Sequence, residues 1–196
     1  MSVISTGWAR LDRALGGGLQ RGSVVALTGD QGDGKTALAV AVLGAASGAG
    51  CCVAMVGRDD AARRAPAGVW LGHATDDRQA ATMVGELARC GAVDLIVLDA
   101  LEDAAAVALD VLSRRCVEGG CALLLVIRAE PWLRTPLAVS LCVQARIDLQ
   151  RDGRVRVIRR GCAVDWFAPA GRVHPPEEAE RRRLDSPRLG SLRRRA

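Results

Sequence analysis

Apolar runs alternate with helix-forming stretches along most of the chain. Four runs rich in aliphatic residues have the length of buried strands, and they fall at residues 23–28, 51–56, 93–98 and 121–127. Helical spacing of apolar residues, or richness in alanine and leucine, predicts helices at residues 8–15, 37–43, 76–90 and 104–117. Strands and helices in this order predict an α/β fold with a mainly parallel central sheet flanked by helices. We expect irregular structure over residues 61–75, and Ser5 or Thr6 as the cap of the first helix.

The C-terminal part of the chain has a different pattern. Residues 141–149 and 154–158 are predicted to form two strands, joined by a turn in which Asp152-Gly153 favours a hairpin. This β-hairpin would extend the sheet. From His174 onward, seven arginines stand against four acidic residues in a proline-punctuated stretch. We therefore expect a folded domain over residues 1–173 and a disordered arginine-rich tail over residues 174–196.

Composition narrows the class of protein. The chain has 196 residues, no tyrosine and one phenylalanine, so its core must be aliphatic, as in a parallel sheet covered by helices. The sequence contains no apolar run long enough to cross a bilayer and no secretory signal at its N-terminus. The seven cysteines form no C-x-x-C pair and are interpreted as reduced thiols. These features predict a cytoplasmic location without membrane contact.

The strongest motif lies between the first predicted strand and the helix that follows it. Residues 29–36 fit the phosphate-loop pattern G-x-x-x-x-G-K-[ST], in which backbone N–H groups and a helix N-terminus surround an anion. Lys35 is the only lysine of the chain, and its flexible ammonium suits terminal phosphates. Thr36 offers a hydroxyl to Mg²⁺. The candidate nucleotide-binding residues are Gly29, Asp30, Gln31, Gly32, Asp33, Gly34, Lys35, Thr36 and Ala37.

A second acidic position accompanies this loop. Asp99 follows an apolar strand, and carboxyl ends of parallel strands are where α/β folds bind ligands. We predict that Asp99 and Thr36 form the magnesium site. The alternative is that Asp99 caps the next helix.

The flanks of the phosphate loop carry a family resemblance. The run Ile4-Ser5-Thr6-Gly7, Leu11-Asp12, Leu15-Gly16-Gly17-Gly18-Leu19 and Gly22 resembles the start of a RecA-like (RecA/RadA-type) ATPase core, and residues 87–99 resemble that family's approach to its second nucleotide motif. The resemblance implies ATP and Mg²⁺ as cofactors.

The resemblance also implies a glutamate at the end of the neighbouring strand, which orients the attacking water. Here that place holds Asp59 and Asp60, whose side chains are shorter. Glu102 is the other catalytic candidate, and it also suits a helix N-terminus. We therefore expect slow or absent ATP hydrolysis.

The resemblance also implies a setting in DNA metabolism. The family's recombinases grip single-stranded DNA with long loops after the third and fourth strands, and we expect both to be short here. The loop after the fourth strand holds Trp132 and Arg134, a lone aromatic and a lone cation of the kind that contact single-stranded DNA. We expect the chain to start almost at the ATPase core, with neither the recombinases' polymerising arm before it nor a C-terminal domain appended to it. In size and plan it resembles the ImuA-type accessory subunits of bacterial damage tolerance.

Three functions follow as expectations. The first is an ATP-binding accessory protein in DNA repair, damage tolerance (the SOS response) or recombination. It would bind a RecA-type filament or an error-prone polymerase, with single-stranded DNA as a possible ligand of the tail. The second is an active DNA-stimulated ATPase or minimal recombinase. The third is a KaiC-like regulatory ATPase that does not act on DNA. A small-molecule kinase is disfavoured because no arginine-rich lid separates the motifs. Self-association stays open.

Overall fold

The computed structural model describes residues 2–58, 65–101, 108–127, 142–159 and 162–167. The elements in chain order are β1 (Val3–Ile4), α1 (Ala9–Leu15), β2 (Leu19–Gln20), β3 (Val24–Gly29), α2 (Lys35–Gly48), β4 (Val53–Gly57), β5 (Trp70–His73), α4 (Asp77–Arg89), β6 (Leu95–Leu101), α5 (Leu109–Gly119), β7 (Ala122–Ile127), β8 (Ala145–Leu149), β9 (Arg154–Arg159) and β10 (Cys162–Phe167). Among these residues, β1 and β2 form a small antiparallel pair and the other strands form one sheet.

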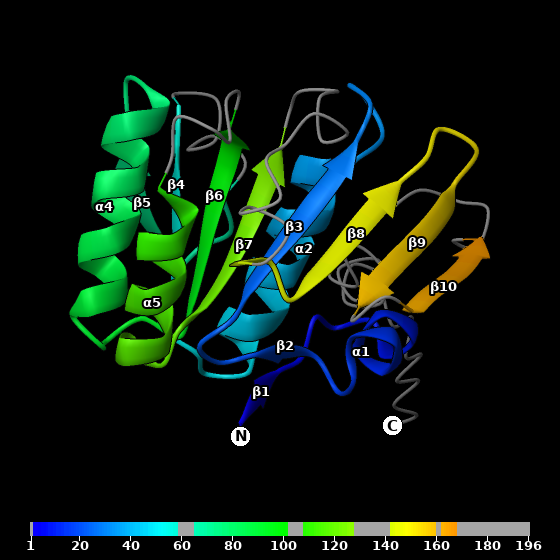
Figure 1. The fold of residues 1–196 in the computed structure, drawn as a ribbon, viewed down its shortest axis with the longest axis horizontal. Coiled ribbons are helices and arrows are strands. Elements are labelled where there is room, and N and C mark those ends of the chain that lie inside the picture. Colours follow the sequence, from blue (N-terminus) through cyan, green and yellow to red (C-terminus); the bar gives the residue numbers. More distant parts are fainter. Residues whose placement is uncertain (1, 59–64, 102–107, 128–141, 160–161, 168–196) are drawn as a thin grey trace, which may run out of the picture.

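The main sheet has the order β10-β9-β8-β3-β7-β6-β4-β5 (Figure 1). From β8 to β5 neighbouring strands are parallel, whereas β8, β9 and β10 pair antiparallel. This confirms the predicted α/β fold with a mainly parallel sheet, helices and a C-terminal hairpin. The hairpin gains a further strand, β10, which the sequence pattern did not indicate.

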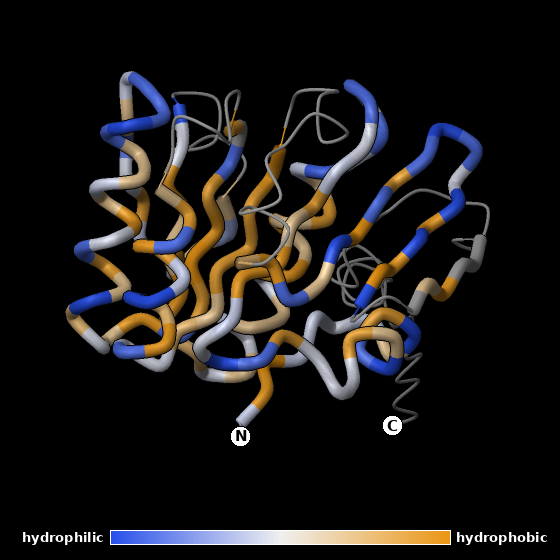
Figure 2. The backbone as a smooth tube through the Cα atoms, in the orientation of Figure 1, coloured by the Kyte–Doolittle hydropathy of each residue, from blue (hydrophilic) through white to orange (hydrophobic). Residues whose placement is uncertain are grey.

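Two apolar layers cover the sheet. Successive strand residues point to opposite faces, so Val25 and Leu27 pack with α1 and α2, whereas Val24 and Ala26 pack on the side of α4 and α5. Figure 1 shows α2 on one side of the sheet and α4 with α5 on the other. Figure 2 shows the central strands as nearly continuous apolar segments and the hairpin as alternating polar and apolar ones. That difference follows from burial, since β3 is almost wholly buried and β8 buries alternate residues.

Three expectations about local structure were wrong. Within the irregular segment predicted at 61–75, Trp70–His73 form β5, a parallel edge strand on β4. Its side chains are mostly exposed, so no apolar alternation marked it. The hydroxyls of Ser5 and Thr6 do not cap α1; with the Thr6 backbone N–H they donate to the carboxylate of Asp12, at 2.6 to 2.8 Å. The structure places Trp8 at the N-cap instead.

The third difference concerns the strand of Asp99. This strand, β6, continues to Leu101, so Asp99 lies within it and not after its end. Its pairing with β7 shifts register between Leu98 and Leu101. The helix α5 begins at Leu109 with Ala108 as its N-cap, and residues 104–107 of the predicted helix lie outside the described residues. Asp99 is therefore not the cap of that helix, and the strand irregularity is of the kind that re-aims a side chain near a site.

Candidate phosphate site

The phosphate loop lies between two adjacent, firmly held elements. β3 pairs with β7 on one side and β8 on the other, and it delivers the chain to the loop at Gly29. α2 then begins at Lys35, after Gly34 in the left-handed conformation (φ 86°). The first N–H groups of a helix lack partners within it. No described side chain caps α2, and its first turn carries no acidic residue, so this end of the helix suits an anion.

Lys35 is folded over its own loop. Its residue is 7% exposed, and Nζ donates to the backbone carbonyls of Gly29 and Asp30, each at 2.6 Å. These contacts hold the ammonium where the loop begins. A positive charge is thereby positioned beside the α2 N-terminus, as a phosphate group requires.

Thr36 and Asp99 come together although they are far apart in sequence. The Thr36 hydroxyl donates to Oδ1 of Asp99 at 3.1 Å, and Asp99 is 4% exposed. A hydroxyl and a carboxylate are both hard oxygen ligands, as Mg²⁺ prefers. In the part of the chain that the structure describes, no three His, Cys, Asp or Glu side chains cluster as a metal site. Thr36 and Asp99 therefore suit a magnesium ion that takes its remaining ligands from water and phosphate.

The catalytic candidates are not placed by the structure. Asp59 and Asp60 follow the end of β4, and Glu102 follows β6, but all three lie outside the described residues. Trp132, Arg134 and the tail at 174–196 also lie outside them. Their expected roles stay predictions.

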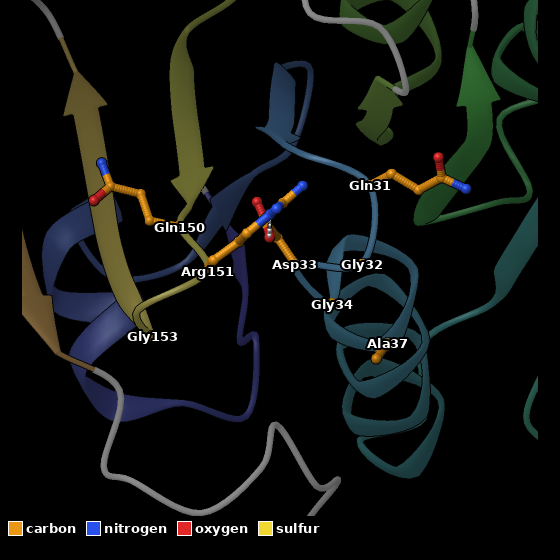
Figure 3. Close-up of a pocket in the computed structure, with 8 residues that line it drawn as sticks. All are labelled: Gln31, Gly32, Asp33, Gly34, Ala37, Gln150, Arg151 and Gly153. Carbon is orange, nitrogen blue, oxygen red and sulfur yellow. Dashed lines mark ion pairs between the residues drawn. The ribbon is translucent and has the colours of Figure 1, made fainter.

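A cavity of about 460 Å³ lies beside the loop, and the sequence had not indicated it. Its walls come from the loop, the first turn of α2 and the turn between β8 and β9 (Figure 3). Gln150, Arg151 and Gly153 belong to that turn, which sequence reasoning treated only as a hairpin connection. No short-range signal could reveal this, because the turn reaches the loop only through the pairing of β8 with β3.

Asp94, at the opposite end of the sheet, connects segments of the fold and takes no part in the phosphate site. Asp94, just before β6, pairs with Arg21 and accepts from the backbone N–H of Cys52 at 2.7 Å. Burial by itself raises the pKa of Asp94, but the hydrogen bonds from Arg21 and Cys52 and the charge of Arg21 outweigh it and lower the pKa. Asp94 thus joins β4, β6 and the segment before β3, at the end of the sheet away from the loop.

Fold and site together define an α/β protein that carries a phosphate-loop motif between its strand β3 and its helix α2. The family model "RecA N-terminal domain" matches residues 1–113, more than half of the chain, and the chain belongs to this family. It is 34% identical over 110 residues to the RecA protein of Porphyromonas gingivalis, covering 52% of this chain and 32% of that protein. It is 39% identical over 110 residues to the RecA protein of Streptomyces venezuelae, covering 52% and 29%.

The fold extends beyond the aligned sequence. A crystal structure of the RadB recombinase superposes with a TM-score of 0.61 at 18% identity, covering 84% of this chain and 96% of that one. The chain spans about a third of the length of the curated relatives it matches. Among the described residues, no helix has the length and apolar content needed to cross a membrane.

Proposed function

We propose that this protein binds ATP with Mg²⁺ and acts as an accessory protein in DNA repair, damage tolerance or recombination. The observation that carries the nucleotide part is the contact of Thr36 with Asp99 beside Lys35 and the uncapped start of α2. Lys35 and the α2 N-terminus would hold the phosphates. Thr36 and Asp99 would hold the magnesium ion, which neutralises phosphate charge when bound.

Family membership supports the DNA context. The residues that follow β4 support the accessory role, because they lack the glutamate that would activate water for hydrolysis. The strand beside β6 ends at Gly57, followed by Arg58, Asp59 and Asp60 with no glutamate. An aspartate reaches less far, and a displacement of about 1 Å at a reacting group costs roughly a hundredfold in rate. Slow or absent hydrolysis suits a protein that uses ATP to fix a conformation for a partner. The proposed partners are a recombinase filament, a polymerase or DNA.

Binding and turnover of ATP test the nucleotide part. We expect purified protein to bind ATP with magnesium, and to hydrolyse it far more slowly than once per second. Absence of binding at millimolar ATP would refute the proposal. Turnover near once per second that single-stranded DNA stimulates and Lys35→Ala abolishes would replace it with an active DNA-dependent ATPase.

Partner capture tests the accessory part. The full chain, its Lys35→Ala variant and a chain ending at Val173 are compared as baits in extracts of DNA-damaged cells. We expect repair or polymerase proteins with the full chain and their loss with at least one variant. If neither variant alters the captured set, the accessory role through ATP or the tail is wrong. ATP-driven self-assembly without any DNA binding would favour the regulatory alternative.

A further inference from the structure

The phosphate loop has an unusual charge for a site that is to receive a triphosphate. Residues 29–36 contain two aspartates, Asp30 and Asp33, against one lysine. Carboxylates within a few ångströms of a polyanion oppose its binding. The loop therefore needs a compensating cation from outside its own sequence.

Asp33 is the more consequential of the two. Its side chain is 2% exposed, and Oδ2 accepts from the backbone N–H of Asp30 at 2.6 Å. Oδ1 is buried and has no hydrogen-bond partner among the residues that the structure describes. A buried carboxylate oxygen without a donor is costly unless a charge lies close to it.

That charge comes from the β8–β9 turn. Arg151 Nε lies 3.8 Å from Oδ1 of Asp33 and 3.6 Å from Oδ2 of Asp30. Figure 3 shows the Arg151 side chain extending from the turn to Asp33, with their ion pair drawn as a dashed line. A guanidinium stays charged throughout the physiological pH range, so the compensation is permanent.

Strand pairing fixes the turn in this place. Gly29 and Leu149 are register partners in the parallel β3–β8 ladder. A Cβ at Gly29 would lie 2.5 Å from the carbonyl oxygen of Leu149 and 3.2 Å from Oδ2 of Asp33. Glycine at position 29 thus lets the loop, the folded-back Asp33 and the end of β8 meet.

We propose that Arg151 is a positioning residue of the phosphate site. It neutralises Asp33 and Asp30, and thereby makes the loop receptive to a triphosphate. Arg151 acts through Asp33 and not by contact with the nucleotide base. The inference rests on the proposed ATP binding and names the residue that permits it. The Arg151 side chain is 75% exposed, so its ion pairs contribute little to folding stability.

The test measures the affinities of four variants and the wild type for magnesium–ATP and magnesium–tripolyphosphate by calorimetry. The variants are Arg151→Gln, Arg154→Gln, Asp33→Asn and the double variant Asp33→Asn/Arg151→Gln. Arg154 is the matched control, since it lies three residues further on and pairs with Asp152, at 3.8 Å. Asparagine at position 33 keeps an acceptor for the Asp30 N–H and removes the charge.

We expect Arg151→Gln to weaken binding of both ligands by about tenfold at low salt, and less at high salt. Arg154→Gln should change it by less than about twofold. In the Asp33→Asn background, removal of Arg151 should cost less than about threefold, because the charge it compensates is gone.

Three results would overturn the proposal: an Arg151→Gln affinity equal to wild type, an undiminished loss in the Asp33→Asn background, or a loss with ATP but not with tripolyphosphate. The last would mean that Arg151 contacts the base or ribose. These results differ from failure of the proposed function, in which the wild type itself binds no ATP.

Discussion

Two aspartates, one just before β6 and one in its carboxyl half, have different environments. Asp94 precedes β6 and is bound by an arginine and a backbone N–H, which lower its pKa. Asp99, in the carboxyl half of β6, has the hydroxyl of Thr36 as a neighbour. The first contact joins segments of the fold. The second places a carboxylate beside a phosphate loop. Both residues are aspartates, so residue type alone does not separate these roles. Their positions do, because loops that bind ligands follow the carboxyl ends of parallel strands, and only Asp99 lies near that end.

The largest expected effect on ATP affinity comes from Lys35, in the phosphate loop at the carboxyl end of the sheet. Lys35→Ala removes two charge-assisted hydrogen bonds of the loop and the cation for phosphate, and should weaken ATP binding by about a hundredfold. Calorimetry with magnesium–ATP measures this. Lys35→Arg should lose nearly as much, because a planar guanidinium presents its donors in a rigid fork, whereas the compact ammonium donates to both carbonyls. Near-normal affinity of either variant would contradict the site.

The next largest effect on ATP affinity is expected at Asp99, with Asp94 as its control. Asp99→Asn should abolish the gain in ATP affinity that magnesium provides, about tenfold, because an amide is a weaker ligand for a hard cation. Asp94→Asn, just before the same strand, is the matched control and should leave ATP affinity unchanged. Titration of ATP with and without magnesium measures both. The comparison fails if the two variants lose the magnesium effect equally.

A change at Asp94, before the amino end of β6, should alter the free energy of unfolding and not the affinity for ATP. Asp94→Asn should lower the free energy of unfolding at neutral pH by about 1–2 kcal/mol, since the contacts are partly exposed. Denaturant titration measures this. Asp110→Asn, on an exposed position of α5, should change it by less than about 0.5 kcal/mol. An Asp94→Asn variant as stable as wild type would show that the Arg21 pair contributes nothing.

Low pH should remove the difference in unfolding free energy between the wild type and Asp94→Asn. The pKa of Asp94 is lower in the folded protein than in the unfolded chain, where it is about 3.9. The stabilisation is therefore present above the unfolded-state pKa and is lost as pH falls through the folded-state pKa. The gap in unfolding free energy between wild type and Asp94→Asn should shrink from about pH 5 downward. A gap that is constant to pH 3 would mean that the charge of Asp94 is not involved.

The smallest effect is expected for the conservative change of Thr36 to serine. Thr36→Ser keeps the hydroxyl that meets Asp99, so ATP affinity should change by less than about threefold. Thr36→Val removes the hydroxyl at similar volume and should behave like Asp99→Asn. Equal affinities of the serine and valine variants would show that the shape of the side chain matters here and its hydroxyl does not.

The sequence by itself determined the phosphate loop, the alternation of strands and helices, and Asp99 as a carboxylate near the loop. These follow from local signals: eight consecutive loop residues, continuous apolar runs, and the position of an acidic residue late in a buried strand. Lys35 and Thr36 needed no distant information, because the loop and the start of α2 are contiguous.

Only the tertiary structure decided which distant groups meet. Arg151 lies near Asp33 because β8 pairs with β3, and Arg21 meets Asp94 across 73 positions of sequence. The edge strand β5 exists through its ladder with β4 and carries no apolar pattern of its own. Such contacts depend on strand order and register, which a local stretch of sequence does not encode.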